Sequence, residues 1–145
     1  MSTDSARHPA PPSAILETCL SVSDLTQSRA FFEDVFGYAA MVADERLCAF
    51  NVGGAQVLIL FSREEVTQPV HLPFGTIPSH GSQGESHIGF RIPAESLDEW
   101  RARLEERGIP IESTVTWPLG GTSIYFRDPD GHLLELLTPG VWPIY

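Results

Sequence analysis

The sequence predicts an α+β fold in which one strand–helix–three-strand unit occurs twice. Two stretches with apolar residues at every second position, Ile15–Ser23 and His87–Ile92, open the two halves. Each stretch is followed by an amphipathic helical pattern that a glycine ends, at Gly37 and at Gly108. Three short strand patterns complete each half, which is the order that an internal duplication would leave.

The first module is expected to span residues 14–62. Its opening strand alternates between an apolar face and a small or polar face that includes Glu17. Asp24, with Gln27 three residues later, resembles a capping box that starts the helix. The three strands that follow are placed at 38–43, 47–52 and 56–61, with turns at Asp44-Glu45 and Gly53-Gly54.

A long loop is expected over residues 63–84, where prolines and glycines interrupt any periodicity. A loop of this length inside a compact domain is usually a lid, a binding loop or a linker. The second module, 85–139, repeats the order of the first. Ser96 and Glu99 form its capping box, and its last three strands are placed at 111–117, 122–127 and 132–138, with a turn at Asp128-Pro129-Asp130-Gly131.

The two ends of the chain are expected to add little to this domain. Residues 1–13 are polar and proline-rich and are predicted to be a flexible tail. Residues 140–145 form a short C-terminal extension. The segment at the start has no apolar stretch typical of a signal peptide, and nothing approaches the 18 apolar residues of a membrane span.

Composition excludes several classes of partner. Nine basic against nineteen acidic residues give a formal charge of −10, which disfavours nucleic acid and anionic membrane surfaces. All nine basic residues are Arg, so neither a Schiff-base lysine nor a P-loop lysine is available. Two isolated cysteines, Cys19 and Cys48, form no disulfide framework and favour a cytoplasmic location.

Three ionisable residues occupy unusual strand positions. Glu17 and His87 open the first strand of each half, and Glu135 interrupts the apolar run Leu133–Leu137. A carboxylate in such a run is costly to bury unless it is paired or bound to a cation. If the halves pack pseudo-symmetrically, the three could hold one divalent ion, Zn, Ni, Co, Mn or Fe. Singly, each has a structural explanation: a satisfied strand histidine, an exposed Glu17, and a Glu135 paired with Arg91 or Arg127.

The segments ILETCLSVSDLTQSRAFFEDVFGY, HIGFRI and SIYFRDPDGHLLEL resemble the vicinal oxygen chelate superfamily of glyoxalases, bleomycin and fosfomycin resistance proteins and extradiol dioxygenases. The resemblance covers about residues 15–139. It implies two βαβββ modules in a cupped, partly open mixed sheet with helices outside, commonly as a homodimer with paired or swapped modules. It places the metal ligands on Glu17, His87 and Glu135, and implies a small-molecule substrate with vicinal oxygens.

Departures from the family pattern refine the expected reaction. The first ligand position is usually His or Gln, and Glu17 there favours lyase or isomerase-type proton transfer over ring cleavage. Ile59 stands where glyoxalase I has a fourth acidic ligand. Tyr125 and His80 are the candidate catalytic acids or bases. The resemblance to extradiol dioxygenases also implies a second-sphere His, for which His71 or His80 is the candidate.

Three other functions remain open. One is ring cleavage of the extradiol dioxygenase type, for which Tyr125 has the right spacing before Glu135. The other is a bleomycin-resistance-like protein that sequesters a cationic drug without catalysis. The acidic charge and the aromatic residues Phe74, Trp117 and Trp142 are compatible with such a groove. A pseudoenzyme or subunit-association domain is a third.

Overall fold

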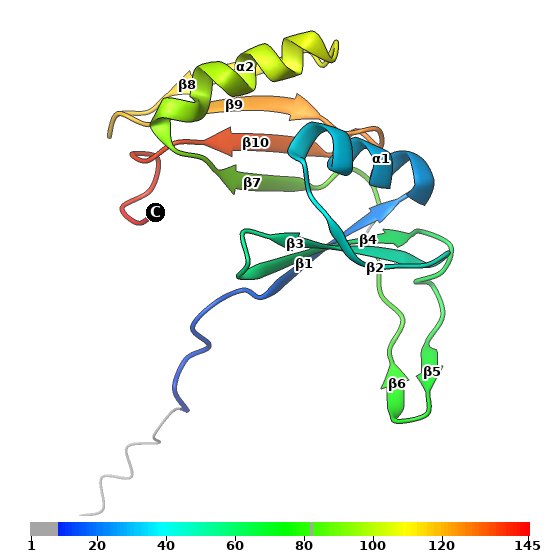
Figure 1. Cartoon of the computed structure of the whole chain (residues 1–145). Coiled ribbons are helices and arrows are strands. Elements are labelled where there is room, and N and C mark those ends of the chain that lie inside the picture. Colours follow the sequence, from blue (N-terminus) through cyan, green and yellow to red (C-terminus); the bar gives the residue numbers. More distant parts are fainter. Residues whose placement is uncertain (1–8, 82) are drawn as a thin grey trace, which may run out of the picture.

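The computed structural model describes residues 9–81 and 83–145, so most of the expected tail lies outside the described residues. The first module comprises β1 (Glu17–Val22), α1 (Leu25–Phe36), β2 (Ala40–Ala43), β3 (Leu47–Val52) and β4 (Gln56–Ser62). The second comprises β7 (His87–Arg91), η1 (Ala94–Ser96), α2 (Leu97–Glu106), β8 (Ser113–Thr116), β9 (Thr122–Arg127) and β10 (Leu133–Leu137). The predicted α+β fold with two βαβββ modules is confirmed (Figure 1).

Each module forms its own four-stranded mixed sheet. The strand orders are β1-β4-β3-β2 and β7-β10-β9-β8, and the first strand of each module pairs in parallel with the last. The two registers correspond, because Glu17 lies opposite Val57 in one sheet and His87 lies opposite Leu133 in the other. Glu17 and His87 are therefore equivalent positions, as the sequence predicted.

The two helices begin differently. The Asp24 side chain accepts a hydrogen bond from the Gln27 backbone N–H at 3.0 Å and caps α1, and Gly37 ends that helix with φ of 71°. The capping box expected at Ser96 is wrong. The Ser96 side chain makes no capping bond, because the chain enters α2 through the 3₁₀ turn η1 and Ser96 already has helical backbone angles.

The expected loop at 63–84 contains a short hairpin that the sequence did not predict. Strands β5 (Val70–Leu72) and β6 (Gly75–Ile77) pair in antiparallel fashion around Pro73 and Phe74. The hairpin projects away from the two modules (Figure 1). The prolines lie outside the paired strands, so they end the strands without breaking the ladder.

One hydrophobic core spans both modules. The apolar faces of both sheets contribute to it, with Leu20 and Val22 from β1 and Phe90 from β7. Phe36, at the end of α1, reaches the second module, where its ring contacts Phe90 at 4.8 Å and Trp100 at 5.7 Å between centroids. The opposite face of each sheet lies away from this core, and we call it the open face. Glu17 and Cys19 lie on the open face of the first sheet, and His87 on that of the second.

His132 joins the modules from inside. Its side chain is fully buried in the turn before β10. Its Nδ1 accepts a hydrogen bond from the Ser86 backbone N–H at 2.8 Å, so the ring proton lies on Nε2. Nε2 donates to the Ser21 carbonyl of β1 at 2.9 Å. One imidazole thus links the strand that carries Glu17 to the residue before His87.

The same turn carries two aspartates in opposite environments. Burial by itself would raise the pKa of Asp130, but hydrogen bonds from Ser23 and Ser28 of the first module outweigh it and hold the pKa below its usual value. Burial raises the pKa of Asp128. Its Oδ1 accepts the backbone N–H groups of Asp130 and His132, while its Oδ2 is buried with no hydrogen-bond partner among the residues that the structure describes.

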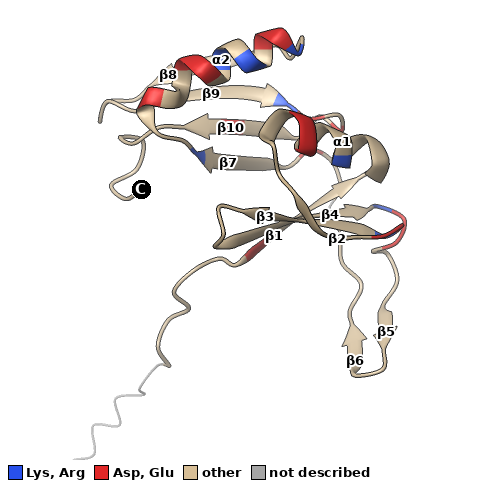
Figure 2. Cartoon of the chain, in the orientation of Figure 1, with Lys and Arg blue, Asp and Glu red and all other residues tan. Residues whose placement is uncertain are grey.

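Charge is unevenly distributed over the elements. Acidic residues lie along α2 (Figure 2), which carries Asp98, Glu99, Glu105 and Glu106. Within the described part of the chain, no helix has both the length and the apolar character needed to cross a bilayer.

Candidate functional site

His87 and Glu135 meet on the open face of the second sheet. The parallel pairing of β7 and β10 sets His87 opposite Leu133 and Glu135 opposite Gly89, so their side chains rise from neighbouring strands on one face. The distance between His87 Nε2 and Glu135 Oε1 is 3.1 Å. The Glu135 side chain is 10% exposed, whereas the His87 side chain is 49% exposed. The pair therefore has one buried member and one open to solvent.

The hydrogen bonds of His87 determine what this pair can hold. Its Nδ1 lies 2.9 Å from the Leu133 carbonyl oxygen, which can only accept, so Nδ1 carries a proton. In the neutral ring, Nε2 then turns a lone pair toward a carboxylate oxygen. Two acceptors at this distance need either a proton between them or a bound cation.

The spacing of this pair fits a divalent metal. Ligand atoms about 2.1 Å from one ion, at angles of roughly 90–109°, lie about 3.0–3.4 Å apart. A carbonyl acceptor behind the imidazole is also the usual support of a metal-binding histidine. The two side chains thus fit two neighbouring positions around one cation.

Tyr125 completes the polar cluster. It lies opposite Glu135 on β9, and its ring stacks near that of His87, with centroids 6.1 Å apart. Burial, and then the charge of Glu135, raise the pKa of Tyr125. Next to it, Trp117 donates its indole N–H to the Ser123 hydroxyl at 2.8 Å. Nothing in the sequence pattern pointed to Trp117 and Ser123 as a pair, because they meet only through the β8–β9 turn.

The alternative partners expected for Glu135 are wrong. Arg91 lies over the Tyr145 ring, with 5.1 Å between the guanidinium carbon and the ring centroid. Arg127 forms ion pairs with Glu112 at 2.8 Å and Glu85 at 3.3 Å. Both guanidinium groups are engaged elsewhere, and the partner of Glu135 is His87.

Glu17 lies apart from this cluster. It is exposed on the open face of β1, whereas His87 and Glu135 occupy the open face of the other sheet. Over residues 9–81 and 83–145, no three His, Cys, Asp or Glu side chains come together as metal ligands. A single chain therefore brings two of the three expected ligands together and keeps the third on the other module.

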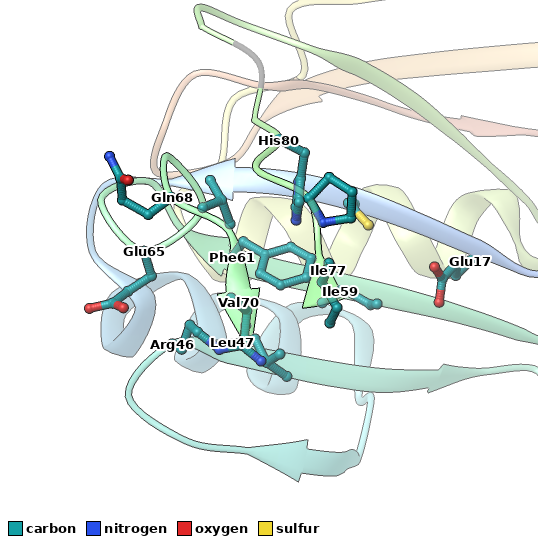
Figure 3. A pocket seen from close by; sticks show the side chains of 13 residues that line it. Glu17, Arg46, Leu47, Ile59, Phe61, Glu65, Gln68, Val70, Ile77 and His80 are labelled. Atoms are coloured by element: carbon teal, nitrogen blue, oxygen red, sulfur yellow. The ribbon is translucent and has the colours of Figure 1, made fainter. Parts of the chain in front are cut away.

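Glu17 does not border the His87–Glu135 pair but a cavity of about 410 Å³ on its own module (Figure 3). It opens between the first sheet and the segment that carries the β5–β6 hairpin. His80 lines it with its ring edge-on to Phe61, 4.7 Å between centroids, and Cys19 lies on its wall. Neither Tyr125 nor His87 borders it. His71 points elsewhere on the hairpin, where its Nδ1 pairs with the Thr76 hydroxyl at 2.9 Å.

Comparisons with known proteins identify the family and agree with the fold. Residues 14–136 match the model of the glyoxalase/bleomycin resistance protein/dioxygenase superfamily. A metallothiol transferase FosB from Shouchella clausii is 32% identical over 120 residues, which cover 81% of this chain and 75% of that protein. The crystal structure of a lactoylglutathione lyase from Agrobacterium tumefaciens superimposes with a TM-score of 0.85 at 36% identity, covering 93% of this chain and all of the other.

A more distant structure shows the same fold. The fosfomycin resistance protein FosX from Listeria monocytogenes has a TM-score of 0.65 at 23% identity and covers 88% of this chain and 93% of its own. The family resemblance seen in the sequence is thus confirmed by a match over most of the chain. The chain belongs to the glyoxalase/bleomycin resistance protein/dioxygenase superfamily.

Proposed function

We propose that this protein is a divalent-metal-dependent enzyme that acts on a small molecule with vicinal oxygen atoms. The observation that supports it best is the convergence of His87 Nε2 and Glu135 Oε1 at 3.1 Å, with Nδ1 already committed to the Leu133 carbonyl. Membership of a superfamily that includes a metallothiol transferase and a lactoylglutathione lyase supports the same conclusion.

In this proposal, His87 and Glu135 bind the metal ion, and Tyr125 acts as the general acid or base. A bound divalent ion would supply a Lewis acid that polarises substrate oxygens. Leu133 keeps the His87 tautomer fixed, and the packing around Glu135 holds its carboxylate in one orientation. Tyr125, beside both, has a hydroxyl placed to give or take a proton at the substrate. His80 stays a second candidate, since it borders the cavity next to Glu17.

The third ligand, Glu17, is proposed to come from a second copy of the chain in a homodimer. Glu17 and His87 are equivalent in the two modules, and both lie on open faces that the shared core leaves uncovered. A two-fold dimer that set the open face of one chain against that of the other would bring Glu17 to the His87–Glu135 pair twice.

Metal analysis tests the ligand assignment. We expect His87→Ala and Glu135→Gln to lose most of the metal that the parent protein binds after loading with Zn²⁺ or Mn²⁺ and desalting. His71→Ala is the matched control, because it removes an exposed imidazole from the hairpin. Unchanged metal content in both site variants, with circular dichroism showing intact folding, would refute the assignment.

Mixing two inactive variants tests the origin of Glu17. In a dimer with shared sites, Glu17→Ala mixed with the double variant His87→Ala/Glu135→Ala leaves one intact site in each mixed dimer. Random exchange then restores roughly a quarter of the parent metal content. If all ligands come from one chain, mixing restores nothing, and the shared site is wrong.

The proposed reaction class is proton transfer of the lyase or isomerase type. Glu17 as a ligand and Tyr125 beside the pair favour it, and the lactoylglutathione lyase is 36% identical to this chain. Thiol transfer is the second candidate, favoured by the 32% identity with the metallothiol transferase. Both relatives have thiol chemistry in their names, so assays should supply a low-molecular-weight thiol.

Two substrates separate these reactions. The hemithioacetal of glutathione and methylglyoxal tests proton transfer, and fosfomycin with a thiol tests thiol addition. We expect Tyr125→Phe to lower kcat by 10²-fold or more with little change in KM, as loss of a general acid or base does. An unchanged kcat would remove Tyr125 from the mechanism.

A further inference from the structure

The open faces of the two sheets differ in chemistry at equivalent positions. The strand registers make Ile59 the counterpart of Glu135 and Ala49 the counterpart of Tyr125. Where the second sheet carries a carboxylate and a phenol, the first therefore carries aliphatic side chains. The first sheet has no reacting groups at those positions, and its open face is suited to hold an apolar part of a ligand.

The cavity beside Glu17 is built on this apolar face. Ile59 and Phe61 of β4 form its floor, and Val66, Val70 and Ile77 line it from the hairpin segment. Val66 is 3% exposed and Phe61 is 9% exposed, whereas Ile77 is 41% exposed, so the segment covers part of the face and leaves an open cavity of about 410 Å³. A cavity of this size with mostly apolar walls is typical of a small-molecule site.

The polar residues of the cavity lie at its two ends. In Figure 3, Glu17 lies at one end, and Arg46, Glu65 and Gln68 lie at the other, with Phe61 between them. His80 meets Phe61 edge-on, and the two rings give the cavity an aromatic surface against which a ligand ring can pack. A ligand body in this cavity would be apolar in the middle, with its oxygen-bearing end toward Glu17.

We propose that this cavity binds an aromatic substituent of the substrate, so that the enzyme prefers aryl-substituted to methyl-substituted vicinal-oxygen compounds. This inference rests on the proposed function, because Glu17 as a metal ligand is what places the cavity next to the reacting oxygens. In a dimer with shared sites, the chain that supplies Glu17 also supplies the aryl pocket.

Two hydroxamates test the preference. Acetohydroxamate and benzohydroxamate offer the same pair of vicinal oxygens to a metal and differ only in a methyl against a phenyl group. We expect calorimetry on the zinc-loaded protein to give a Kd about 10- to 100-fold lower for benzohydroxamate, from burial of the ring. Equal affinities would overturn the proposal.

A pair of hairpin variants locates the ring. Ile77 faces the cavity from β6, whereas Thr76 is on the other face of the same strand, paired with His71. Ile77→Trp should fill the cavity and abolish the benzohydroxamate preference, while acetohydroxamate affinity stays within about twofold. Thr76→Trp, the matched control, should keep the preference. A preference that survives in Ile77→Trp would place the ring elsewhere and refute the assignment.

A metal-free measurement separates this inference from the proposed function. We expect benzohydroxamate at millimolar concentration to shift the methyl NMR signals of Ile59, Val66 and Ile77 in the apoprotein, and acetohydroxamate to leave them unchanged. If the protein binds no metal but these methyl signals shift, the proposed metal site is refuted and the proposed aryl pocket is supported. If metal binds and the methyl groups do not respond, only the pocket fails.

Discussion

Replacing His132 with Leu should remove the hydrogen bonds by which this side chain joins the two modules, without leaving a cavity in its place. The imidazole is fully buried, and leucine has a similar volume, so packing changes little. What disappears is the pair of hydrogen bonds, from the Ser86 N–H at 2.8 Å and to the Ser21 carbonyl at 2.9 Å.

The two bonds contribute unequally. Ser21 is buried, so its carbonyl would lose its partner without gaining water, at a cost of about 1–3 kcal/mol. Ser86 is only half-buried, and water can replace its bond at a cost of about 0.5–1.5 kcal/mol. The free energy of unfolding should therefore fall by roughly 2–4 kcal/mol, a large share of the 5–15 kcal/mol typical of a domain.

Chemical denaturation measures this loss, as a lower midpoint at unchanged m-value. His132→Gln is the informative companion, because its amide nitrogen can occupy the position of Nε2 and keep the bond to Ser21. We expect the order of stability to be parent, then Gln, then Leu. A Leu variant within about 1 kcal/mol of the parent, or a Gln variant no better than Leu, would show that these bonds do not hold the modules together.

Substitutions at three further positions test other contacts of the fold. Asp128→Asn should be neutral or stabilising near pH 7, because burial raises the pKa of Asp128 and its charge weakens the fold above that raised pKa. Asp128→Ala should destabilise the protein by about 1–3 kcal/mol, since Oδ1 accepts two backbone N–H groups. Thermal melts of both variants measure the two effects. The pKa of Asp130 is lowered in the folded protein, so its contribution to the free energy of unfolding is present above the usual pKa of about 3.9 and is lost as the pH falls through the lower folded pKa. Asp130→Asn should therefore make stability fall less steeply at acid pH. A stability–pH curve with the same acid slope as the parent would contradict this. Gly121→Ala should strongly lower the free energy of unfolding measured in denaturant, because the added Cβ would lie 2.6 Å from the Gly140 carbonyl carbon. That atom belongs to the backbone and cannot move aside as a flexible side chain would. A midpoint equal to the parent's would show that the turns at Gly121 and Gly140 can separate.

Much of the fold could be predicted from the sequence because the signals are local. Alternation placed Leu20 and Phe90 on the core faces, and Asp24 and Gly37 bounded the first helix. The hairpin at 70–77 was missed because each strand is three residues long, too short for alternation to show among prolines. The entry to α2 was wrong because a 3₁₀ turn satisfies the backbone without Ser96.

The sequence by itself determined which residues lie on the open faces, since period-two alternation assigns a face without any knowledge of the partner strands. It therefore put Glu17 and His87 on the open faces, whereas Glu135 lies in a continuous apolar run that shows no alternation. Tertiary structure decided which of them meet. Glu135 found His87 instead of an arginine because the parallel β7–β10 register joins residues 48 positions apart. Such non-local pairing also placed His132 between the modules and left the cavity beside Glu17, and no local pattern encodes either.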